Sequence, residues 1–390
     1  MIDGKRAIAV LGCGGMGGGH AVAISTGSGT AIWKIKSTEG GEQLRDGDTD
    51  ISKKLVLAGT YDIEEARQEW ARAQGFRAYE SYEAILADGD VDIVLIATPN
   101  HLHKDEAIRA MRAGKHVLCE KPVMITSDEL EDVMAVARET GKVFYPRQNR
   151  RWDQDYLIIK KIFDDKMVGD VFNIESRVHG SRGIPGDWRG VKEYGGGMML
   201  DWGVHLLDRI LDMVGGKVTK VFASMTHITN ADCDDGFKMH MTFESGITAV
   251  IEVGTCNFIN LPLWYIAGTQ GTAVIQNWQC DGKIVRLESW EDKDAAPILA
   301  GEGLTKTMAP RIGDSTVELP LPDVWFDSNE LYSNLVDVVD AAEGSGGAAA
   351  AGYDGGAVKQ IVTCEQALRC LKLMEAAFES DEKGKVVYFE

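Results

Sequence analysis

Residues 7–17 read Ala-Ile-Ala-Val-Leu-Gly-Cys-Gly-Gly-Met-Gly, and this stretch decides the fold of the chain. The apolar residues predict a buried strand, and the glycine spacing G-x-G-x-x-G follows at once, as expected where a strand turns into a helix. One glycine permits the tight bend, one lets the backbone approach a pyrophosphate, and one allows close packing of helix on strand. The stretch therefore predicts a dinucleotide-binding turn.

The predicted phosphate contacts are the residues of the turn itself. We expect Gly12, Gly14, Gly15, Met16 and Gly17 to surround the pyrophosphate, because backbone N–H groups and the dipole at a helix N-terminus attract anions. Glycine-rich turns are common in a chain with 44 glycines, so the assignment depends on the flanking strand and helix.

The first third of the chain alternates short apolar runs with helical patterns, which is typical of a parallel sheet flanked by helices. We predict a doubly wound, Rossmann-type α/β domain over residues 1–147. Strands are predicted at 7–11, 55–60, 91–97, 116–119 and 143–145, and the later helices at 63–74, 82–87, 104–113 and 127–140.

Asp62 is the acidic residue expected at the end of the second strand, where it would hold the ribose hydroxyls of the nucleotide. Its charge would repel the 2′-phosphate of NADP, so NAD is favoured, although Arg67 could argue for NADP. Asp62 lies further from the glycine turn than usual, because a polar, glycine-rich insertion occupies about 25–53. A solvated loop is favoured there over a lid or a subunit contact.

Length, charge and cysteine content limit the class of protein. The 390 residues are too many for one hydrophobic core and predict two domains. A net charge of -19 would repel phosphate backbones and anionic lipids, which disfavours nucleic-acid and membrane partners. Small molecules and other subunits are the expected partners. The seven cysteines lack the paired spacing of a zinc site or disulfide framework, which indicates reduced thiols in the cytoplasm.

Glu120-Lys121-Pro122 closes the strand predicted at 116–119. In an open α/β sheet ligands bind at the carboxyl ends of the strands, so Lys121 would stand at the ligand crevice. A lysine held in such a crevice can give or take protons, unlike a solvated surface lysine. Taken alone, the tripeptide would be an ordinary strand-to-loop junction.

A second group of polar residues follows the glycine run 195–197. Asp201 and His205 are four residues apart on a predicted helix with one apolar side, so both side chains would project from the same face. A carboxylate beside an imidazole can orient the ring and raise its basicity. The alternative is a capping or surface pair, and the glycine run together with Lys121 favours a functional site.

These motifs together resemble the Gfo/Idh/MocA family of NAD(P)-dependent oxidoreductases. The resemblance rests on the segments 12–17, 98–103, 113–122 and 195–208. It covers the chain from its N-terminus to about residue 215, and the later sheet is similar only in its pattern.

The resemblance implies that Lys121, Asp201 and His205 form the catalytic set. In hydride transfer between C4 of nicotinamide and a secondary alcohol or ketone, His205 would take the hydroxyl proton and Lys121 would stabilise charge on the oxygen. Asp201 would orient the pair and tune their pKa values. Asp201 and His205 would also contact the substrate. Whether Lys121 or His205 moves the proton is left open.

Further cofactor contacts are expected from the two loops that follow the strands at 91–97 and 116–119. Thr98, Pro99 and Asn100 would pass their backbone beside the nicotinamide ribose. Glu120 would hold Lys121 or a ribose hydroxyl. His103, at a helix start, is either part of the site wall or a capping residue.

Asn149, Arg150, His179 and Trp188 are the further substrate contacts that we expect. Arginine and asparagine suit hydroxyl recognition, and a tryptophan covers the apolar face of a sugar ring. The alternative for each residue is ordinary packing. No cluster of carboxylates or histidines in the sequence suggests a metal site.

The strand-rich pattern after residue 168 predicts an α+β domain for substrate binding and oligomerisation over 148–390, with a large, mostly antiparallel open sheet. Its strands are predicted at 218–228, 238–243, 247–253, 263–266 and 272–275, an insertion within 276–325, and a last helix at 358–378 that packs back on the body. In the resembling family such a sheet builds dimers and tetramers, so a homodimer or homotetramer is expected.

The sequence therefore predicts a cytoplasmic, NAD-dependent oxidoreductase that acts on a sugar, polyol or glycoside. One alternative is a glycosidase that oxidises its sugar transiently with NAD, which the same catalytic residues do not exclude. A non-catalytic sugar or NAD sensor is disfavoured by the presence of Lys121, Asp201 and His205.

Overall fold

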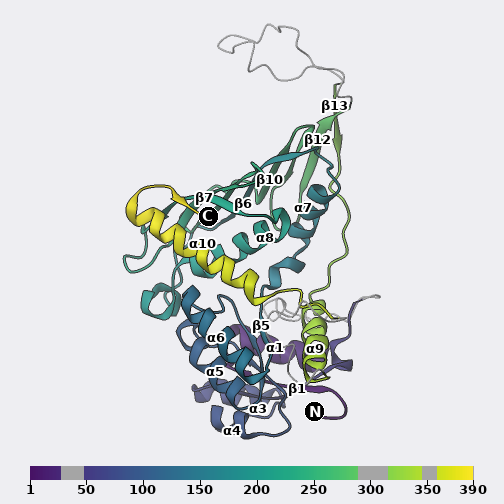
Figure 1. Ribbon diagram of the computed structural model, residues 1–390, viewed down its shortest axis with the longest axis vertical. Helices are drawn as coiled ribbons and strands as arrows, with labels where there is room; N and C mark the ends of the chain where they lie inside the picture. Colours follow the sequence, from purple (N-terminus) through teal and green to yellow (C-terminus); the bar gives the residue numbers. More distant parts are fainter. Residues whose placement is uncertain (28–47, 289–314, 345–357, 390) are drawn as a thin grey trace.

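The computed structural model has two sheet-and-helix layers, stacked along the long axis of the molecule (Figure 1). The structure describes residues 1–27, 48–288, 315–344 and 358–389. Most of the insertion predicted at 25–53 and the middle of the one predicted at 276–325 lie outside the described residues. The lower layer in Figure 1 holds the N-terminal sheet and the upper layer the larger one.

The lower sheet is parallel, with strand order β2-β1-β3-β4-β5. Its strands are β1 Arg6–Leu11, β2 Leu55–Tyr61, β3 Ile93–Ile96, β4 His116–Cys119 and β5 Phe144–Pro146. After β2 the chain crosses to the other side of β1, so the strand order reverses between β1 and β3. Ligands of open α/β sheets bind at such a reversal. The predicted Rossmann-type sheet is confirmed.

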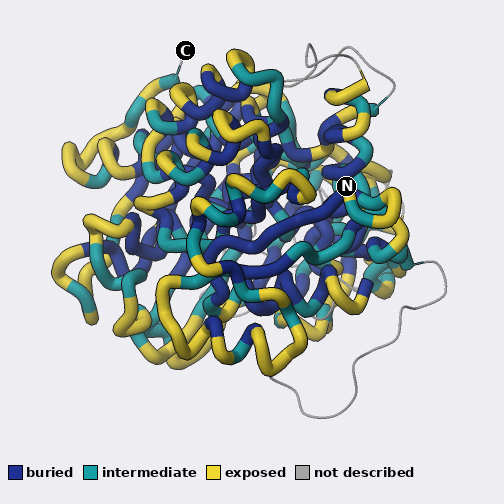
Figure 2. The backbone as a smooth tube through the Cα atoms, turned by 90° about the horizontal axis from the view of Figure 1, so that it is seen from below, coloured by how far each residue is buried: buried dark blue, intermediate teal, exposed yellow. Residues whose placement is uncertain are grey.

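Helices cover both faces of the lower sheet, because its strands are apolar on both sides. Ile8 and Val10 face α1 and α9, whereas Ala9 and Leu11 face α4, α5 and α6. Figure 2 shows these strands as a buried centre ringed by exposed loops. The helices of this layer are α1 Gly15–Thr26, α3 Glu65–Ala73, α4 Tyr82–Ala87, α5 His103–Arg112, α6 Ser127–Thr140 and α9 Asn329–Gly344.

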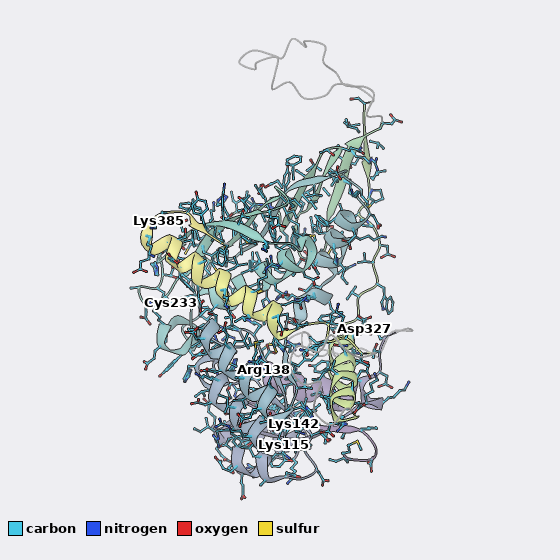
Figure 3. The ribbon with its side chains drawn as sticks, viewed as in Figure 1. Lys115, Arg138, Lys142, Cys233, Asp327 and Lys385 are labelled. Atoms are coloured by element: carbon cyan, nitrogen blue, oxygen red, sulfur yellow. The ribbon has the colours of Figure 1, made fainter. Side chains whose placement is uncertain are left out.

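Helix α9 comes from the later part of the chain, yet it completes the N-terminal layer. Its apolar side is buried against β1, β3 and β4. Arg6 Nε donates a hydrogen bond to Asp340 at 2.7 Å, and Lys54 Nζ donates one to Asp337 at 2.6 Å. This helix was not predicted from the sequence. It begins close to Asp327, which is labelled in Figure 3.

The upper sheet has the strand order β13-β12-β11-β10-β6-β9-β8-β7-β14. All neighbours pair antiparallel except β6 and β9, which are parallel. The predicted large, mostly antiparallel sheet is confirmed. Its strands are β6 Val171–His179, β7 Val218–Thr226, β8 Gly236–Phe243, β9 Thr248–Gly254, β10 Trp264–Gly268, β11 Gly271–Ile275, β12 Gly282–Leu287, β13 Thr316–Leu319 and β14 Val387–Tyr388.

One face of the upper sheet is covered by α7 (Gln154–Asp164), α8 (Val204–Val214) and α10 (Cys364–Lys383). The predicted start of the last helix at 358 is wrong. Thr363 accepts a hydrogen bond from the N–H of Gln366, whose side chain accepts one from the N–H of Thr363. This capping box fixes the first turn, so the helix begins at residue 364.

Arg151 ties three elements of the upper layer together. It lies in the short helical turn Asn149–Trp152, and its Nε and Nη2 donate to the two carboxylate oxygens of Asp208 on α8 at 2.8 and 2.6 Å. Its Nη1 donates to Gln366 at the start of α10 at 3.1 Å. The Arg151 and Asp208 side chains are only 6% and 3% exposed, so this buried pair holds α8 in place.

Replacement of Arg151 by methionine should destabilise the protein by about 3–5 kcal/mol, because Asp208 would remain buried without its cation. The free energy of unfolding is measured by denaturant titration. The double variant Arg151→Met/Asp208→Leu should recover most of the loss, because it removes the unpaired charge. The control Lys160→Ala removes an exposed pair with Asp164 and should cost under about 0.5 kcal/mol. Equal losses in Arg151→Met and the control would contradict the argument.

Candidate functional site

The glycine turn follows β1 at the strand-order reversal, and two of its glycines are required by sterics. Gly12 has φ +88, and a Cβ there would lie 2.7 Å from the carbonyl oxygen of Ala97 at the end of β3. A Cβ on Gly17 would lie 1.7 Å from the carbonyl oxygen of Gly12. These two positions let β1, β3 and α1 approach closely, as predicted for this turn.

Gly14 and Gly15 border open space instead, since a Cβ on either would meet no atom within 4 Å. The first turn of α1 has no acidic residue and no capping side chain, and its N-cap is Gly14. Its N–H groups are therefore available to an anion. Both observations fit the pyrophosphate of a dinucleotide, which these glycines and Met16 would hold.

Asp62 stands at the end of β2, beside the glycine turn. Its carboxylate accepts hydrogen bonds from the N–H of Cys13 at 2.6 Å and from the N–H of Glu64 at 2.9 Å. Arg67 Nε lies 3.8 Å from the carboxylate of Glu64 and is half exposed. The structure thus brings Asp62 to the turn, whereas Arg67 pairs with Glu64.

The Thr98-Pro99-Asn100 loop leads from β3 toward the upper layer. Thr98 Oγ1 donates to Glu106 on α5 at 2.5 Å, and burial raises the pKa of Glu106 to about 7. Asn100 is buried, and its Nδ2 donates to the carbonyl of Gly195 at 2.8 Å. The side chains of Thr98 and Asn100 are thus engaged with protein, which leaves the backbone of this loop for the predicted contact with a ligand.

His103 is completely buried and holds two site loops together. Its Nδ1 lies 3.0 Å from the carbonyl oxygen of Pro122, and its Nε2 lies 3.0 Å from that of Thr98. Burial lowers the pKa of the ring, although both carbonyls favour its protonated form. His103 was predicted either to form part of the site wall or to cap a helix. A ring with no exposed surface does not fit the first of these roles.

Glu120 is buried between two basic side chains. Its Oε1 is 2.7 Å from His20 Nε2 and accepts from Arg147 Nη1 at 2.9 Å. Its Oε2 accepts from the backbone N–H of Lys121 at 3.1 Å. Burial alone would raise its pKa, but Arg147 and His20 outweigh burial and hold the pKa well below the usual range. Glu120 therefore fixes the backbone of Lys121, and within the described residues no hydrogen bond joins it to the Lys121 side chain.

His20 on α1 extends this network to α9. Its Nδ1 lies 2.5 Å from the hydroxyl of Tyr332, and both rings are buried. No catalytic or binding role was predicted for His20, Arg147 or Tyr332. Residues from both ends of the chain therefore converge behind the Glu120-Lys121-Pro122 turn.

Lys121 reaches across to the upper layer and pairs with Asp201. Its Nζ donates to Asp201 Oδ1 at 2.7 Å and to the backbone carbonyl of Asp201 at 2.9 Å. Arg189 Nε lies 3.6 Å from Asp201 Oδ2. Burial would raise the pKa of Asp201, but Lys121 and Arg189 outweigh it and lower that pKa. The carboxylate is thus held ionised between two cations.

His205 lies on α8, one turn beyond Asp201, and its ring packs edge-on against Trp202 with centroids 5.9 Å apart. It is buried, and its Nδ1 has no hydrogen-bond partner among the described residues. Burial, and then the positive charges of Lys121 and Arg150, lower its pKa well below 6.5. The surroundings of the ring therefore lower its basicity, whereas a neighbouring carboxylate was expected to raise it.

The geometry between Asp201 and His205 also differs from the prediction. Asp201 lies in a π-helical turn, Met199–Gly203, that precedes α8 rather than in the α-helix itself. Within the described residues its carboxylate meets Lys121 and Arg189, and no hydrogen bond joins it to His205. Asp201 therefore orients Lys121 and not the imidazole.

Asp234 fixes the start of this π-helical turn, and sequence reasoning missed it. Its Oδ2 accepts from the N–H of Met199 at 2.7 Å, and its carbonyl accepts from the N–H of Met198 at 2.9 Å. Gly197 has φ +105, and a Cβ there would lie 2.2 Å from Asp234 Oδ1. Burial raises the pKa of Asp234 to about 7. Its loop, with Cys233 labelled in Figure 3, supports the segment ahead of Asp201.

Arg150 is buried beside the cluster of Lys121, Asp201 and His205, on the turn that begins with the half-buried Asn149. Its guanidinium lies 4.4 Å from the centre of the Trp202 ring and 5.5 Å from that of Trp278. Its Nη1 donates to Asp153 at 2.6 Å. The structure thus brings Arg150 to the site, and it adds two tryptophans that carry no prediction.

His179 is not brought to the site. Ile174 and Ser176 of β6 face the helices, and strand alternation places Arg177 and His179 on the opposite face. There His179 Nε2 lies 3.5 Å from Glu252. The prediction that His179 contacts the substrate is corrected, because α8 lies on the other side of the sheet.

Trp188 is linked to the site through Arg189. The Arg189 guanidinium stacks on the Trp188 ring at 4.6 Å, and Arg189 in turn reaches Asp201.

The described residues contain no group of three or more His, Cys, Asp or Glu placed to hold a metal ion. They also contain no helix long and apolar enough to cross a membrane.

Comparison with known families agrees with this arrangement. A model of the oxidoreductase family with the NAD-binding Rossmann fold matches residues 6–148, and a model of the GFO/IDH/MocA C-terminal domain matches residues 156–274. The chain belongs to the Gfo/Idh/MocA family of oxidoreductases.

Relatives of this Gfo/Idh/MocA protein include a solved NAD-binding protein from Listeria innocua, which is 43% identical over 99% of both chains with a TM-score of 0.84. The scyllo-inositol 2-dehydrogenase (NADP(+)) IolW of Bacillus subtilis is 25% identical over 85% of this chain and 87% of its own length. A 2,7-anhydro-N-acetylneuraminate hydratase of Escherichia coli is 27% identical over 52% of this chain and 56% of its own length.

In this Gfo/Idh/MocA protein, substitutions at two glycines of the turn are expected to have different effects, one on stability and the other on cofactor binding. Gly17→Ala should lower the free energy of unfolding by about 3 kcal/mol or more, because its Cβ would overlap a backbone carbonyl. The matched variant Gly14→Ala should unfold like the wild type and bind NAD at least about tenfold more weakly, because its Cβ enters only the open space. Thermal unfolding and NAD titration by calorimetry measure the two effects. Equal stability of the two variants would contradict the steric argument.

Proposed function

We propose that the chain is an NAD-dependent dehydrogenase that transfers a hydride between nicotinamide and a secondary alcohol or ketone of a sugar, polyol or glycoside. One observation carries the proposal. The Lys121 ammonium at the end of β4 lies 2.7 Å from Asp201 of the upper layer, one turn from the buried imidazole of His205. A cation, an anchored carboxylate and a neutral base thus meet at the carboxyl edge of the nucleotide-binding sheet.

The three side chains divide the proton chemistry between them. Nicotinamide, when bound, supplies the hydride acceptor or donor. His205 is neutral because its pKa is lowered, so it accepts the hydroxyl proton as the alcohol is oxidised. Lys121 donates a hydrogen bond to the same oxygen and stabilises its developing negative charge. Asp201 holds the Lys121 ammonium in position through the 2.7 Å contact.

The charge balance of the site supports a neutral polyhydroxy substrate. Each cation has a carboxylate partner within 3.0 Å: Lys121 with Asp201, Arg150 with Asp153, and Arg189 with Asp187. The site therefore offers many hydrogen-bond donors and little unbalanced charge, which suits hydroxyl groups better than a carboxylate or phosphate. The names of the relatives, an inositol dehydrogenase among them, support the same class.

The preference for NAD rests on Asp62, whose charge at the end of β2 would repel a 2′-phosphate. The name of the relative IolW specifies NADP, so this part of the proposal needs its own test. We also propose a cytoplasmic homo-oligomer with domains at 1–147 and 148–390. Its subunits would meet through the open face of the upper sheet, where Phe222 of β7 is 42% exposed.

Lys121→Ala and His205→Ala should each lower kcat by about two to four orders of magnitude, because each removes a group that acts on the reacting oxygen. NAD affinity should be largely kept. The rate is followed by absorbance of the reduced nicotinamide with a panel of inositols, aldoses and glycosides. Lys104→Ala, which removes a lysine paired with Asp132 outside the site, is the control and should retain wild-type kcat. Wild-type turnover by Lys121→Ala would overturn the mechanism.

Asp62→Asn should lower the ratio of kcat/KM for NAD to that for NADP by about tenfold or more, because it removes the charge that opposes the 2′-phosphate. The control Glu64→Gln changes the next carboxylate along the chain, which is 70% exposed and paired with Arg67, and should leave the ratio unchanged. A wild type that prefers NADP, or an unchanged ratio in Asp62→Asn, would refute the assignment.

The imidazole of His205 should stay neutral from about pH 6.5 to pH 8, because its pKa is lowered well below 6.5. NMR of protein with ¹³C-labelled histidine measures this directly, and the signal is identified by its loss in His205→Gln. Arg150→Gln should raise the pKa of His205, because it removes a neighbouring positive charge. A wild-type midpoint at or above pH 6.5 would contradict the neutral-base role.

A transient oxidation is the second candidate, and it is supported by a relative that is named a hydratase, because addition of water involves no net oxidation. In that reaction NAD would oxidise a sugar hydroxyl to a ketone, the aglycone would be eliminated, water would add to the resulting double bond, and NADH would reduce the ketone again, with no net change of NAD. Aglycone release without accumulation of NADH would support it. Stoichiometric NADH with no aglycone would support the dehydrogenase.

A further inference from the structure

A row of stacked groups leads from the catalytic histidine to an exposed tryptophan. The Trp202 ring contacts His205, with centroids 5.9 Å apart, and the Arg150 guanidinium lies over Trp202 at 4.4 Å. The same guanidinium lies 5.5 Å from the centre of the Trp278 ring, which is 6.0 Å from that of Trp202. Trp278 is thus linked to His205 through the Trp202 ring, which contacts both.

The turn that carries Trp278 is tightly built. It joins β11 to β12, and Asn277 Oδ1 accepts hydrogen bonds from the N–H groups of Gln279 and Asp281 at 3.1 and 3.2 Å. Asn277 Nδ2 donates to Asp281 Oδ2 at 2.8 Å, and Cys280 adopts φ +60. This internal bonding sets the position of Trp278 before any ligand arrives, which lowers the entropic cost of binding to it.

Trp278 nevertheless keeps 47% of its surface exposed. Its ring contacts, Trp202 and Arg150, belong to the helix-covered side of the upper sheet, so Trp278 is not part of the open face that we assign to subunit contacts. A large apolar ring that is held rigid and half exposed beside a catalytic cluster is suited to stack on another flat or ring-shaped group.

We propose that Trp278 forms a second subsite and that the substrate is a two-ring glycoside. The proposal rests on the proposed function. The ring to be oxidised lies at Lys121 and His205, and the second ring, a sugar or an aromatic aglycone, stacks on Trp278. Trp278 contacts Trp202 and Arg150, whereas the Trp202 ring contacts His205, so a second ring joined to the oxidised one would give the exposed tryptophan an occupant.

The test compares substrates that share the oxidised ring and differ only in the second one. For each sugar that the wild type turns over, kcat/KM is measured with the methyl glycoside, the phenyl glycoside and the disaccharide. The two-ring compounds should exceed the methyl glycoside by about tenfold or more, mainly through a lower KM. In Trp278→Ala this ratio should fall by about tenfold, and in Trp278→Phe it should be largely restored.

Gln279→Ala alters the exposed neighbour of Trp278 in the same turn and should keep the wild-type ratio. Thermal unfolding checks that each variant is folded. Equal kcat/KM for one-ring and two-ring compounds in the wild type would overturn the second subsite and leave the proposed dehydrogenase intact. A Trp278→Ala variant in which kcat/KM falls by the same factor for one-ring and two-ring compounds would also overturn the second subsite. Absence of turnover with every polyhydroxy compound would overturn the proposed function and the subsite with it.

Discussion

The ion pair between the Lys121 ammonium and the Asp201 carboxylate is the interaction on which the site depends, because it joins the two layers of the molecule. The partners are 80 positions apart in the chain and meet at 2.7 Å. A buried carboxylate supports each partner. Glu120 accepts a hydrogen bond from the backbone N–H of Lys121, and Asp234 accepts one from the N–H of Met199, in the same turn as Asp201. A shift of either layer would therefore separate the cation from its anchor.

The parts of the molecule that could be predicted are those whose cause lies within a few residues. The G-x-G-x-x-G turn, the apolar strands and the Lys121 position follow from local sterics and from the rule that ligands bind at the carboxyl ends of parallel strands. Gly12 and Gly17 confirm the steric reasons given for the turn. Asp201 could be found because a glycine run marks a close approach of backbone.

What could not be predicted depends on partners that are distant in the sequence. Glu120 meets His20 across 100 positions, and His20 meets Tyr332 across 312. No local pattern in the sequence identifies such contacts. His179 was misplaced for another reason, since its assignment depended on which face of β6 turns toward the helices, and strand alternation puts it on the far side. The lowered pKa of His205 likewise follows from tertiary burial among cations.

Helix α9 has a consequence for how this protein could have been assembled in evolution. The chain leaves the nucleotide-binding layer after β5, builds most of the upper layer, returns to cover β1, β3 and β4 with α9, and then crosses again to end in α10 and β14. A single recombination point between the layers would strip α9 from the sheet it covers and expose a broad apolar surface. Exchange of a whole layer between relatives would thus require compatible crossings at several points.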